Sequence, residues 1–220
     1  MLIAVPSAVL LGWFSLQAVG LARAGEVSFE TRQTLNEAFV SNGYLGDAKL
    51  AEMYGDLAAV VPAAPHDPTV HELMGILDAR RSDSPAYIAE AGSHFVRALE
   101  LRPVSPDTWV ELAAQKYRVG DTGPVLEKAL VNATRLGPNE PDVQATVANF
   151  GLAVWKDLTP ATHDAVDAMI ARGMKRNPSE FLQISERRGR LEVACSHLVA
   201  RPRGLEAKWI ELCQGMEATS

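Results

Sequence analysis

The chain has 220 residues, of which 47% are hydrophobic, and its formal net charge at pH 7 is −6. A chain of this length and composition can bury a sizeable core, which argues against disorder and predicts one domain or two small ones. The acidic balance excludes general binding to phosphate groups, so no nucleic-acid partner is expected.

The first expected element is an apolar segment, residues 2–22, which contains no charged side chain. In a helix at ~1.5 Å per residue this segment is long enough to cross a bilayer, so we expect it to lead outside the cytoplasm. It ends at Ala22-Arg23-Ala24, an A-x-A pattern that suits signal peptidase, and a cleaved signal and an uncleaved anchor both stay open. No Lys or Arg precedes the segment, so a complete signal would start upstream.

The remainder of the chain predicts a succession of helices, because no run shows the period-two alternation of strands. Helix starts are marked by a side-chain oxygen at the N-cap and a proline at the first helical position. Such dipeptides are Asp67-Pro68, Ser84-Pro85, Ser105-Pro106 and Thr159-Pro160, with Glu140-Pro141 as a weaker example. Glycine or Asn-Pro marks the stops. The expected helices cover residues 28–42, 45–60, 68–80, 85–101, 106–119, 123–136, 141–156, 160–176, 179–199 and 204–215.

The spacing of prolines indicates that these helices form repeated hairpins. Pro103 and Pro138 lie 35 residues apart, and the residues around them repeat at the same distance. A third period ends at Pro178, 40 residues after Pro138. This longer period predicts an insertion of about five residues, which we expect between Trp155 and Pro160.

The helix over 85–101 carries Ala91, Phe95 and Ala98 in the second-helix pattern of a tetratricopeptide (TPR) repeat. The next helix partly matches the first-helix pattern through Trp109, Leu112, Ala113 and Tyr117. We therefore expect an all-α, TPR-like solenoid of stacked antiparallel helical hairpins, preceded by the N-terminal apolar signal or anchor helix. The expected parts are residues 1–24 as signal peptide or membrane anchor, 25–66 as N-terminal helical hairpin or cap, 67–178 as TPR-like repeats and 179–220 as C-terminal helical cap.

No sequence motif indicates catalysis, a metal site or a cofactor. The five histidines include no pair at i, i+4, and the chain has no C-x2-C, H-E-x2-H, G-x-S-x-G or phosphate-binding glycine motif. Carboxylate pairs such as Glu180 with Glu186, or Asp164 with Asp167, could serve a sugar hydrolase, but solvated helix faces explain them as well.

The first helix of each stacked hairpin lines the concave face of a TPR-like solenoid, where partners commonly bind. In the helix that begins at Pro106, the candidate partner-binding groove consists of Thr108, Glu111, Gln115 and Arg118. An ordinary polar face is the alternative. The aromatic residues Trp109, Tyr117, Phe150 and Trp155 occupy packing positions, which favours a core role over a platform for ligands.

Two further features lie near the C-terminus. A candidate basic patch for acidic polysaccharide, lipid headgroups or an acidic partner consists of Arg187, Arg188, Arg190, Arg201 and Arg203. A solvated face that nearby glutamates partly neutralise is the alternative. Cys195 and Cys213 could form a disulfide in an exported protein, worth ~3 kcal/mol in the chain-entropy model, or could be two small buried hydrophobic residues.

Several phrases between residues 99 and 198 go beyond a generic repeat. They are Arg102-Pro103 with Pro106 and Trp109, Leu136-Gly137-Pro138 with Glu140-Pro141 and Val143-Gln144, Gly151-Leu152-Ala153 with Trp155, and Gly189-Arg190-Leu191-Glu192 with Cys195. This pattern resembles the VpsP-type polysaccharide biosynthesis family, small TPR-like proteins encoded with bacterial exopolysaccharide and exosortase-type gene clusters. Asn139 departs from it, since the family pattern has tryptophan there.

The resemblance implies a non-enzymatic helper without a cofactor, periplasmic or anchored in the inner membrane through residues 2–22. Its expected partners are protein components of a polysaccharide synthesis or export machinery, and the polysaccharide itself is a further candidate. We therefore expect a scaffold that assists exopolysaccharide biosynthesis or export through a TPR-like groove. An envelope glycan hydrolase or lyase, and a direct glycan binder using the arginine-rich end, are the alternatives. Carboxylates converging in a deep cleft would favour the enzyme, and a shallow open groove would favour partner binding.

Overall fold

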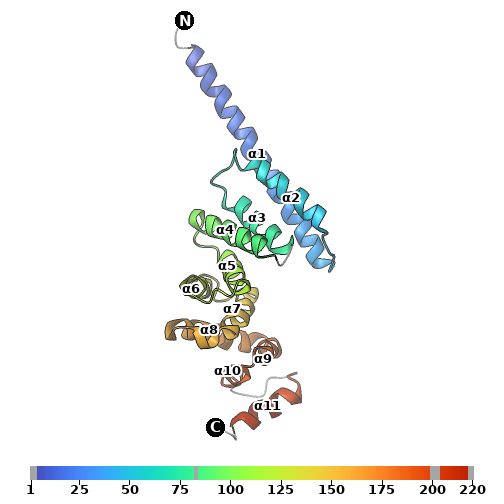
Figure 1. Cartoon of the computed structure of the whole chain (residues 1–220), viewed down its shortest axis with the longest axis vertical. Helices are drawn as coiled ribbons and strands as arrows, with labels where there is room; N and C mark the ends of the chain where they lie inside the picture. The colour runs from blue at the N-terminus through green and yellow to red at the C-terminus, as the bar shows by residue number, and fades with distance from the viewer. Residues whose placement is uncertain (1–3, 82–83, 199–203, 218–220) are drawn as a thin grey trace. The chain divides into compact units, whose positions relative to one another are not determined.

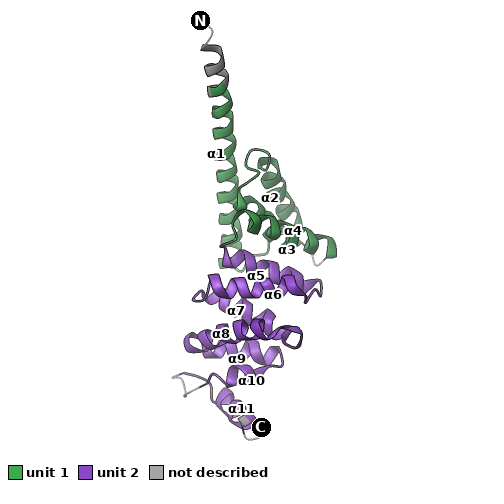
Figure 2. Cartoon of the chain, turned by 90° about the vertical axis from the view of Figure 1, so that its left-hand side faces the viewer, with its two compact units in different colours: residues 1–103 green, residues 104–220 purple. Residues whose placement is uncertain are grey.

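A computed structural model describes residues 4–81, 84–198 and 204–217 (Figure 1). Within these ranges the chain forms eleven α-helices and one short 3₁₀ helix, and it contains no strand. Neighbouring helices pack in pairs, so the predicted all-α fold of helical-repeat type is confirmed. The chain divides into two compact units, unit 1 (residues 1–103) and unit 2 (residues 104–220) (Figure 2).

The described part of unit 1 contains four helices, α1 (Ala4–Val40), α2 (Asp47–Val60), α3 (Pro68–Arg81) and α4 (Pro85–Leu101). Within the unit α3 packs on α4, α2 packs on α3, and α1 contacts both α2 and α3. The buried side chains of α2 recur at intervals of three and four, so they form one stripe along the helix. They are Leu50, Met53, Leu57 and Val60.

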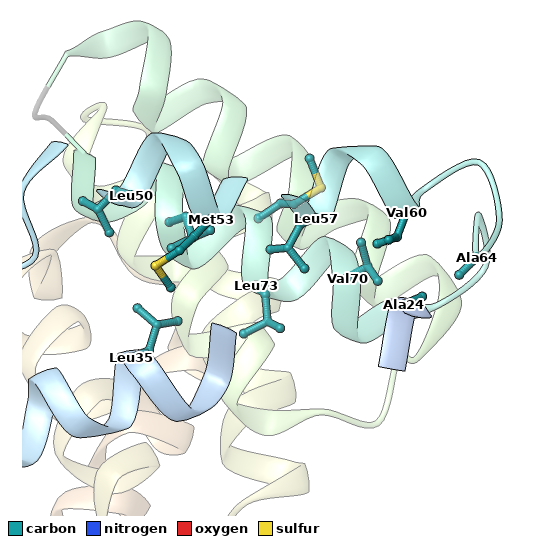
Figure 3. Packing of buried hydrophobic residues seen from close by; sticks show 11 residues of the cluster. Ala24, Leu35, Leu50, Met53, Leu57, Val60, Ala64, Val70 and Leu73 are labelled. Atoms are coloured by element: carbon teal, nitrogen blue, oxygen red, sulfur yellow. The ribbon is translucent and has the colours of Figure 1, made fainter. Parts of the chain in front are cut away.

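In the core of unit 1 this stripe packs against apolar side chains from α1 and α3 (Figure 3). Helix α1 contributes Ala24 and Leu35, which are 1% and 5% exposed. Phe95 of α4 is fully buried and lies against α3 at Gly75, where a Cβ would come within 2.8 Å of the Phe95 ring. Ala91 and Ala98 are also buried, as the repeat pattern predicts for residues at the interface of a helical hairpin.

The N-terminal region differs from its expected division into an apolar segment and a separate helix over 28–42. Helix α1 is continuous from Ala4 to Val40, because no glycine-proline or turn sequence interrupts it. Its residues near position 22 are already part of unit 1, since a Cβ at Gly20 would lie 2.7 Å from the Cβ of Ala63. Residues 2 and 3 of the expected apolar segment lie outside the described residues. Over the ranges that the structure describes, no helix combines the length and the apolarity needed to cross a membrane.

Unit 2 consists of seven described α-helices and the 3₁₀ helix. They are α5 (Pro106–Arg118), α6 (Pro124–Leu136), α7 (Pro141–Ala153), η1 (Trp155–Asp157), α8 (Pro160–Arg176), α9 (Pro178–Arg187), α10 (Leu191–Cys195) and α11 (Ala207–Glu217). Helices α5 and α6 form one hairpin, and α7 and α8 form the next. Helices α5, α7 and α9 contact one another in turn and form a first layer, while α6, α8 and α10 do the same in a second layer.

The extra residues of the third period lie mostly inside α8, not between Trp155 and Pro160 as expected. Helix α8 has 17 residues where its counterpart α6 has 13. The connection before α8, residues 154–159, is only one residue longer than the connection 119–123 before α6. The prediction is therefore wrong for four of the five residues, which add about one turn to α8.

The helix expected over 179–199 is interrupted at Gly189. This residue has a φ of +64°, in the left-handed region that glycine adopts readily, and it separates α9 from α10. Cys195 at the end of α10 forms a disulfide with Cys213 of α11, with 5.3 Å between the two Cα atoms. Both cysteines are also buried, so the two alternatives left open by the sequence are combined in one bonded pair.

Candidate functional site

The four groove residues expected on α5 do not form an exposed surface together. Thr108 is 1% exposed and its hydroxyl donates to the Oγ of Ser105 over 2.8 Å. Gln115 is 4% exposed and its Oε1 accepts a hydrogen bond from Nη1 of Arg118 over 2.8 Å. Glu111 and Arg118 are partly buried. The expectation is corrected on this point, because α5 packs against both α6 and α7 and two of its four polar positions lie inside the structure.

The aromatic residues of unit 2 mostly serve packing. Trp109 is 9% exposed, and the ring of Trp155 stacks on that of His163 with 4.2 Å between the centroids. Tyr117 of α5 and Phe150 of α7 lie side by side in the first layer, with ring centroids 5.3 Å apart. Both are partly exposed, and Tyr117 faces the arginine described below.

An open groove lies between α7 and α9 in the first layer and has a volume of about 540 Å³. Its lining is mainly polar, with Ile184 and Ala145 as the apolar part. The polar lining residues are Thr146, Asn149, Glu180, Arg187 and Arg188. We call this feature the α7–α9 groove.

Arg188 connects three helices at the edge of the α7–α9 groove. Its Nε donates to Oδ1 of Asn149 over 2.9 Å, and its Nη1 donates to the hydroxyl of Tyr117 over 3.3 Å. The guanidinium carbon also lies 5.5 Å from the centre of the Tyr117 ring, within the range of a cation–π interaction. Residues from α5, α7 and the end of α9 therefore fix the position of this guanidinium.

The charges of the α7–α9 groove are not balanced within the described part of the chain. No described carboxylate lies within 4.0 Å of the guanidinium nitrogens of Arg187 or Arg188. Arg187 is exposed. Glu180 accepts a hydrogen bond from Nδ2 of Asn177 over 3.0 Å at the start of α9. The groove thus presents two arginine guanidinium groups, and no ion pair among the described residues compensates their positive charge.

The expected basic patch is only partly brought together. Arg187 and Arg188 both line the α7–α9 groove. Arg190 instead lies 3.7 Å from Glu192, so its charge is partly compensated locally. Arg201 and Arg203 lie outside the described residues.

Sequence reasoning missed Thr146 and Asn149, the two polar residues that α7 contributes to the groove. The 35-residue period contains a signal for the first of them, because it places Thr146 at the position equivalent to Glu111. No comparable signal exists for Asn149, whose equivalent position holds Ala114. The contact between Asn149 and Arg188 spans 39 residues and depends on how α7 packs on α9.

Unit 1 holds a second group of polar side chains between α2, α3 and α4. Asp78 is fully buried, and neither of its oxygens has a hydrogen-bond partner among the described residues. Its carboxylate lies 3.7 Å from Nη1 of Arg81 and 3.8 Å from Nε2 of His94, which contacts the hydroxyl of Tyr54 over 3.1 Å. The ring of His71 stacks on that of His94, with 5.9 Å between centroids.

Burial dominates the titration behaviour of this group. Desolvation, followed by repulsion from Glu90, raises the pKa of Asp78 to about 6, although Arg81 opposes the shift. Burial and the neighbouring His71 lower the pKa of His94. Across the described ranges no three His, Cys, Asp or Glu side chains are placed to hold a metal ion. The group can change charge near neutral pH, but its carboxylate is closed to solvent.

Comparison of the sequence with protein-family models gives no match, and comparison with curated proteins gives none either.

Proposed function

We propose that this protein is a non-enzymatic scaffold that binds a protein partner in the α7–α9 groove and assists bacterial exopolysaccharide biosynthesis or export. The observation that carries the proposal is the open groove in the first layer of unit 2, with amide, hydroxyl and charged side chains on its walls. Stacked helical hairpins commonly use the concave face formed by their first helices for partner binding. The polysaccharide setting rests on the resemblance of residues 99–198 to VpsP-type proteins.

The chemistry of the groove supports binding better than hydrolysis. A glycoside hydrolase needs two carboxyl groups on opposite sides of the scissile bond. The described lining of the α7–α9 groove contains one carboxylate, Glu180, together with two arginines. Asp167, from the other candidate pair, lies 2.7 Å from Nε2 of His197 in an ion pair if that histidine is protonated. Direct binding of an acidic glycan is the second candidate function, which Arg187 and Arg188 favour.

We further propose that residues 2–22 form an uncleaved inner-membrane anchor and that the body of the protein faces the periplasm. The charge-free run begins at Leu2, ahead of the described residues, and its described apolar side chains are largely exposed, for example Trp13 at 55% and Leu16 at 74%. Ala24 is buried in the core of unit 1, and Gly20 contacts Ala63. Cleavage after Ala24 would remove both residues from a packed helix. The Cys195–Cys213 disulfide supports an oxidising compartment.

The N-terminus of the mature protein tests the proposed anchor. The full chain, with a C-terminal affinity tag, is expressed in its bacterial host and purified from the membrane fraction with detergent. Mass spectrometry is expected to find peptides from residues 2–24 in the purified protein. A mature N-terminus at Gly25 would contradict the anchor and establish a cleaved signal.

Partner capture tests the proposed scaffold. The tagged chain is purified from membranes at native expression level, and the co-purifying proteins and the exopolysaccharide yield are measured. We expect components of the polysaccharide machinery with the wild type, and their loss with Arg187→Glu or Thr146→Arg. Arg135→Glu on α6 is the matched control, because Arg135 is exposed in the second layer. Recovery of no such component, or equal recovery with all variants, would reject the proposal.

A further inference from the structure

We infer that the ligand of the α7–α9 groove is an acidic, extended peptide segment of the partner protein, whose Asp or Glu carboxylates are bound by Arg188 and Arg187. This inference rests on the proposed function, since it specifies the chemistry of the same site. The charge and the remaining hydrogen-bonding groups of the groove fit a peptide.

Arg188 keeps hydrogen-bond donors that its described contacts do not use. Its contacts use Nε toward Asn149 and Nη1 toward Tyr117, and both acceptors are neutral. Nη2 donates to no other described residue, so the end of the guanidinium keeps its charge and its capacity to bind an anion. Arginine binds carboxylates through pairs of parallel N–H groups, which gives both strength and orientation.

Contacts within unit 2 hold the Arg188 side chain in place before a ligand binds. A flexible arginine loses side-chain freedom when it binds a ligand, and this loss weakens the complex. The guanidinium of Arg188 is already held by two hydrogen bonds and lies over the Tyr117 ring. Its position is therefore fixed before binding, which is the usual condition for an anchoring residue.

The charges in the lining of the groove favour an acidic ligand. Although the whole chain has a net charge of −6, the groove contains two arginines without a carboxylate partner among the described residues and one glutamate that is bonded to Asn177. An acidic segment is attracted to this local positive potential, and a basic segment is repelled. The exposed position of Arg187 makes its share of the attraction sensitive to salt.

The lining of the groove fits a peptide better than a glycan. The described lining residues include no aromatic ring on which a sugar could stack. Tyr117, outside the lining, already contacts the Arg188 guanidinium, 5.5 Å from its ring centre, and the Phe150 ring, with 5.3 Å between centroids. The Nδ2 of Asn149 can donate to a carbonyl group of an extended backbone, and the hydroxyl of Thr146 can donate to a carbonyl or accept from an N–H group.

Direct binding of defined probes tests the inference. The full-length protein in detergent micelles is titrated, by fluorescence anisotropy, into a labelled 12-residue peptide of alternating Glu and Thr with blocked ends. The same sequence with Gln for Glu removes the charge at constant shape, and labelled oligogalacturonate serves as the acidic glycan. We expect the Glu peptide to bind at least tenfold tighter than the Gln peptide at low salt, and this ratio to shrink at high salt.

Variants then assign the binding to the groove. Arg188→Gln is expected to weaken binding of the Glu peptide about tenfold, since it removes a charge-assisted hydrogen bond. Arg187→Gln is expected to weaken it about threefold, because that side chain is exposed. Arg135→Gln is the matched control and should leave the affinity unchanged. Circular dichroism verifies that each variant is folded.

Equal affinity for the Glu and Gln peptides, or equal losses in Arg188→Gln and the control, would overturn the inference. Preference for oligogalacturonate over the Glu peptide would assign the groove to a glycan and overturn it as well. If the groove variants abolish partner capture from membranes while no acidic peptide binds, the inference fails and the proposed function stands. If the Glu peptide binds the groove while partner capture is unaffected by the variants, the proposed function fails and the ligand chemistry stands.

Discussion

Glu127 of α6 caps the start of α8 through Thr159. Its Oε2 accepts hydrogen bonds from the backbone N–H of Thr159 over 2.8 Å and from the Thr159 hydroxyl over 2.5 Å. The hydroxyl of Thr162 donates to the same oxygen over 2.5 Å. The first N–H groups of a helix lack partners within the helix, and Thr159 itself, expected as the N-cap, makes no side-chain cap bond. A carboxylate from the neighbouring helix supplies the acceptor instead.

Removing this carboxylate should destabilise unit 2. We expect Glu127→Ala to lower the free energy of unfolding by about 1–2 kcal/mol, the range of a lost cap, as measured by urea denaturation. Glu211→Ala on the exposed side of α11 is the control and should change it by less than about 0.5 kcal/mol. An equal effect of the two substitutions would show that the contact contributes nothing.

The stabilisation that the Glu127 carboxylate provides should depend on pH. Desolvation would raise the pKa of Glu127, but hydrogen bonds from Thr159 and Thr162 outweigh it and hold the pKa below its ordinary value. A lowered folded-state pKa means that the stabilisation is present above the unfolded-state pKa of ~4.3 and is lost as the pH falls below it. The difference between the wild type and Glu127→Ala should therefore be constant from pH 8 to 6 and should shrink below pH 4.

Any side chain added at Gly173 of α8 should clash with its neighbour. Phe181 of α9 packs so closely on it that an added Cβ would overlap the ring. We expect Gly173→Ala to destabilise unit 2 by about 1–3 kcal/mol, as overpacking of a core does. Gly55→Ala is the matched control, because Gly55 is exposed within α2 with no atom in reach of a Cβ, and it should stabilise by about 0.5–1 kcal/mol. Thermal melts of both variants check the opposite signs.

The contribution of Asp78 to the free energy of unfolding of unit 1 should be less favourable at alkaline than at mildly acidic pH. Its folded-state pKa of about 6 lies above the unfolded value of ~3.9, so ionisation disfavours the folded state. The penalty is absent below pH ~4 and grows as the pH rises through 6. We expect Asp78→Asn to raise the free energy of unfolding by about 2 kcal/mol at pH 8, with the gain vanishing near pH 4.

The test compares the free energy of unfolding of Asp78→Asn with that of the wild type at each pH. The pKa values of His71 and His94 are both lowered, chiefly by burial, so these histidines destabilise the folded state as the pH falls below ~6.5. Their effect is present in both proteins and largely cancels in the difference. A difference between Asp78→Asn and wild type that does not change from pH 8 to pH 5 would contradict the argument.

The Cys195–Cys213 disulfide closes a loop across a separation of 18 residues and should stabilise the C-terminal part of unit 2. We expect the double variant Cys195→Ser, Cys213→Ser to lose about 3 kcal/mol in the chain-entropy model. Hydrogen exchange should show the loss first in α10 and α11, which the bond connects. Equal exchange in the oxidised wild type and the double variant would contradict this expectation.

Much of the fold could be predicted because proline marks the helix starts of this chain so regularly. Pro85, Pro106, Pro141 and Pro160 each begin the helix expected there, since proline is tolerated at the first position and not later. The break at Gly189 could not be predicted from its residue type alone, because an isolated glycine is tolerated inside helices and interrupts this one only through its positive φ.

The site was harder to predict than the fold, because it depends on contacts between distant residues. The arginines at 187 and 188 were recognisable as a charged pair, but only the packing of α9 on α7 brings Arg188 to Asn149. Conversely, Thr108 and Gln115 have polar side chains in a helical pattern, and only tertiary packing reveals that they are buried. Polar periodicity identifies a helix face and leaves open whether another helix covers it.

Because α1 runs without a break from Ala4 to Val40, its apolar N-terminal half is joined to the core of unit 1 by continuous helix. Leu10 and Leu35 belong to the same helix. A surface that binds the helix at Leu10 therefore also fixes the distance of Leu35 from that surface and its rotation about the helix axis. Each residue added to an α-helix advances it by ~1.5 Å and turns it by ~100°. A single residue inserted between Val19 and Gly20 would thus rotate the whole apolar end by ~100° about the helix axis. Four inserted residues would lengthen the helix by ~6 Å and nearly restore the original orientation of that end.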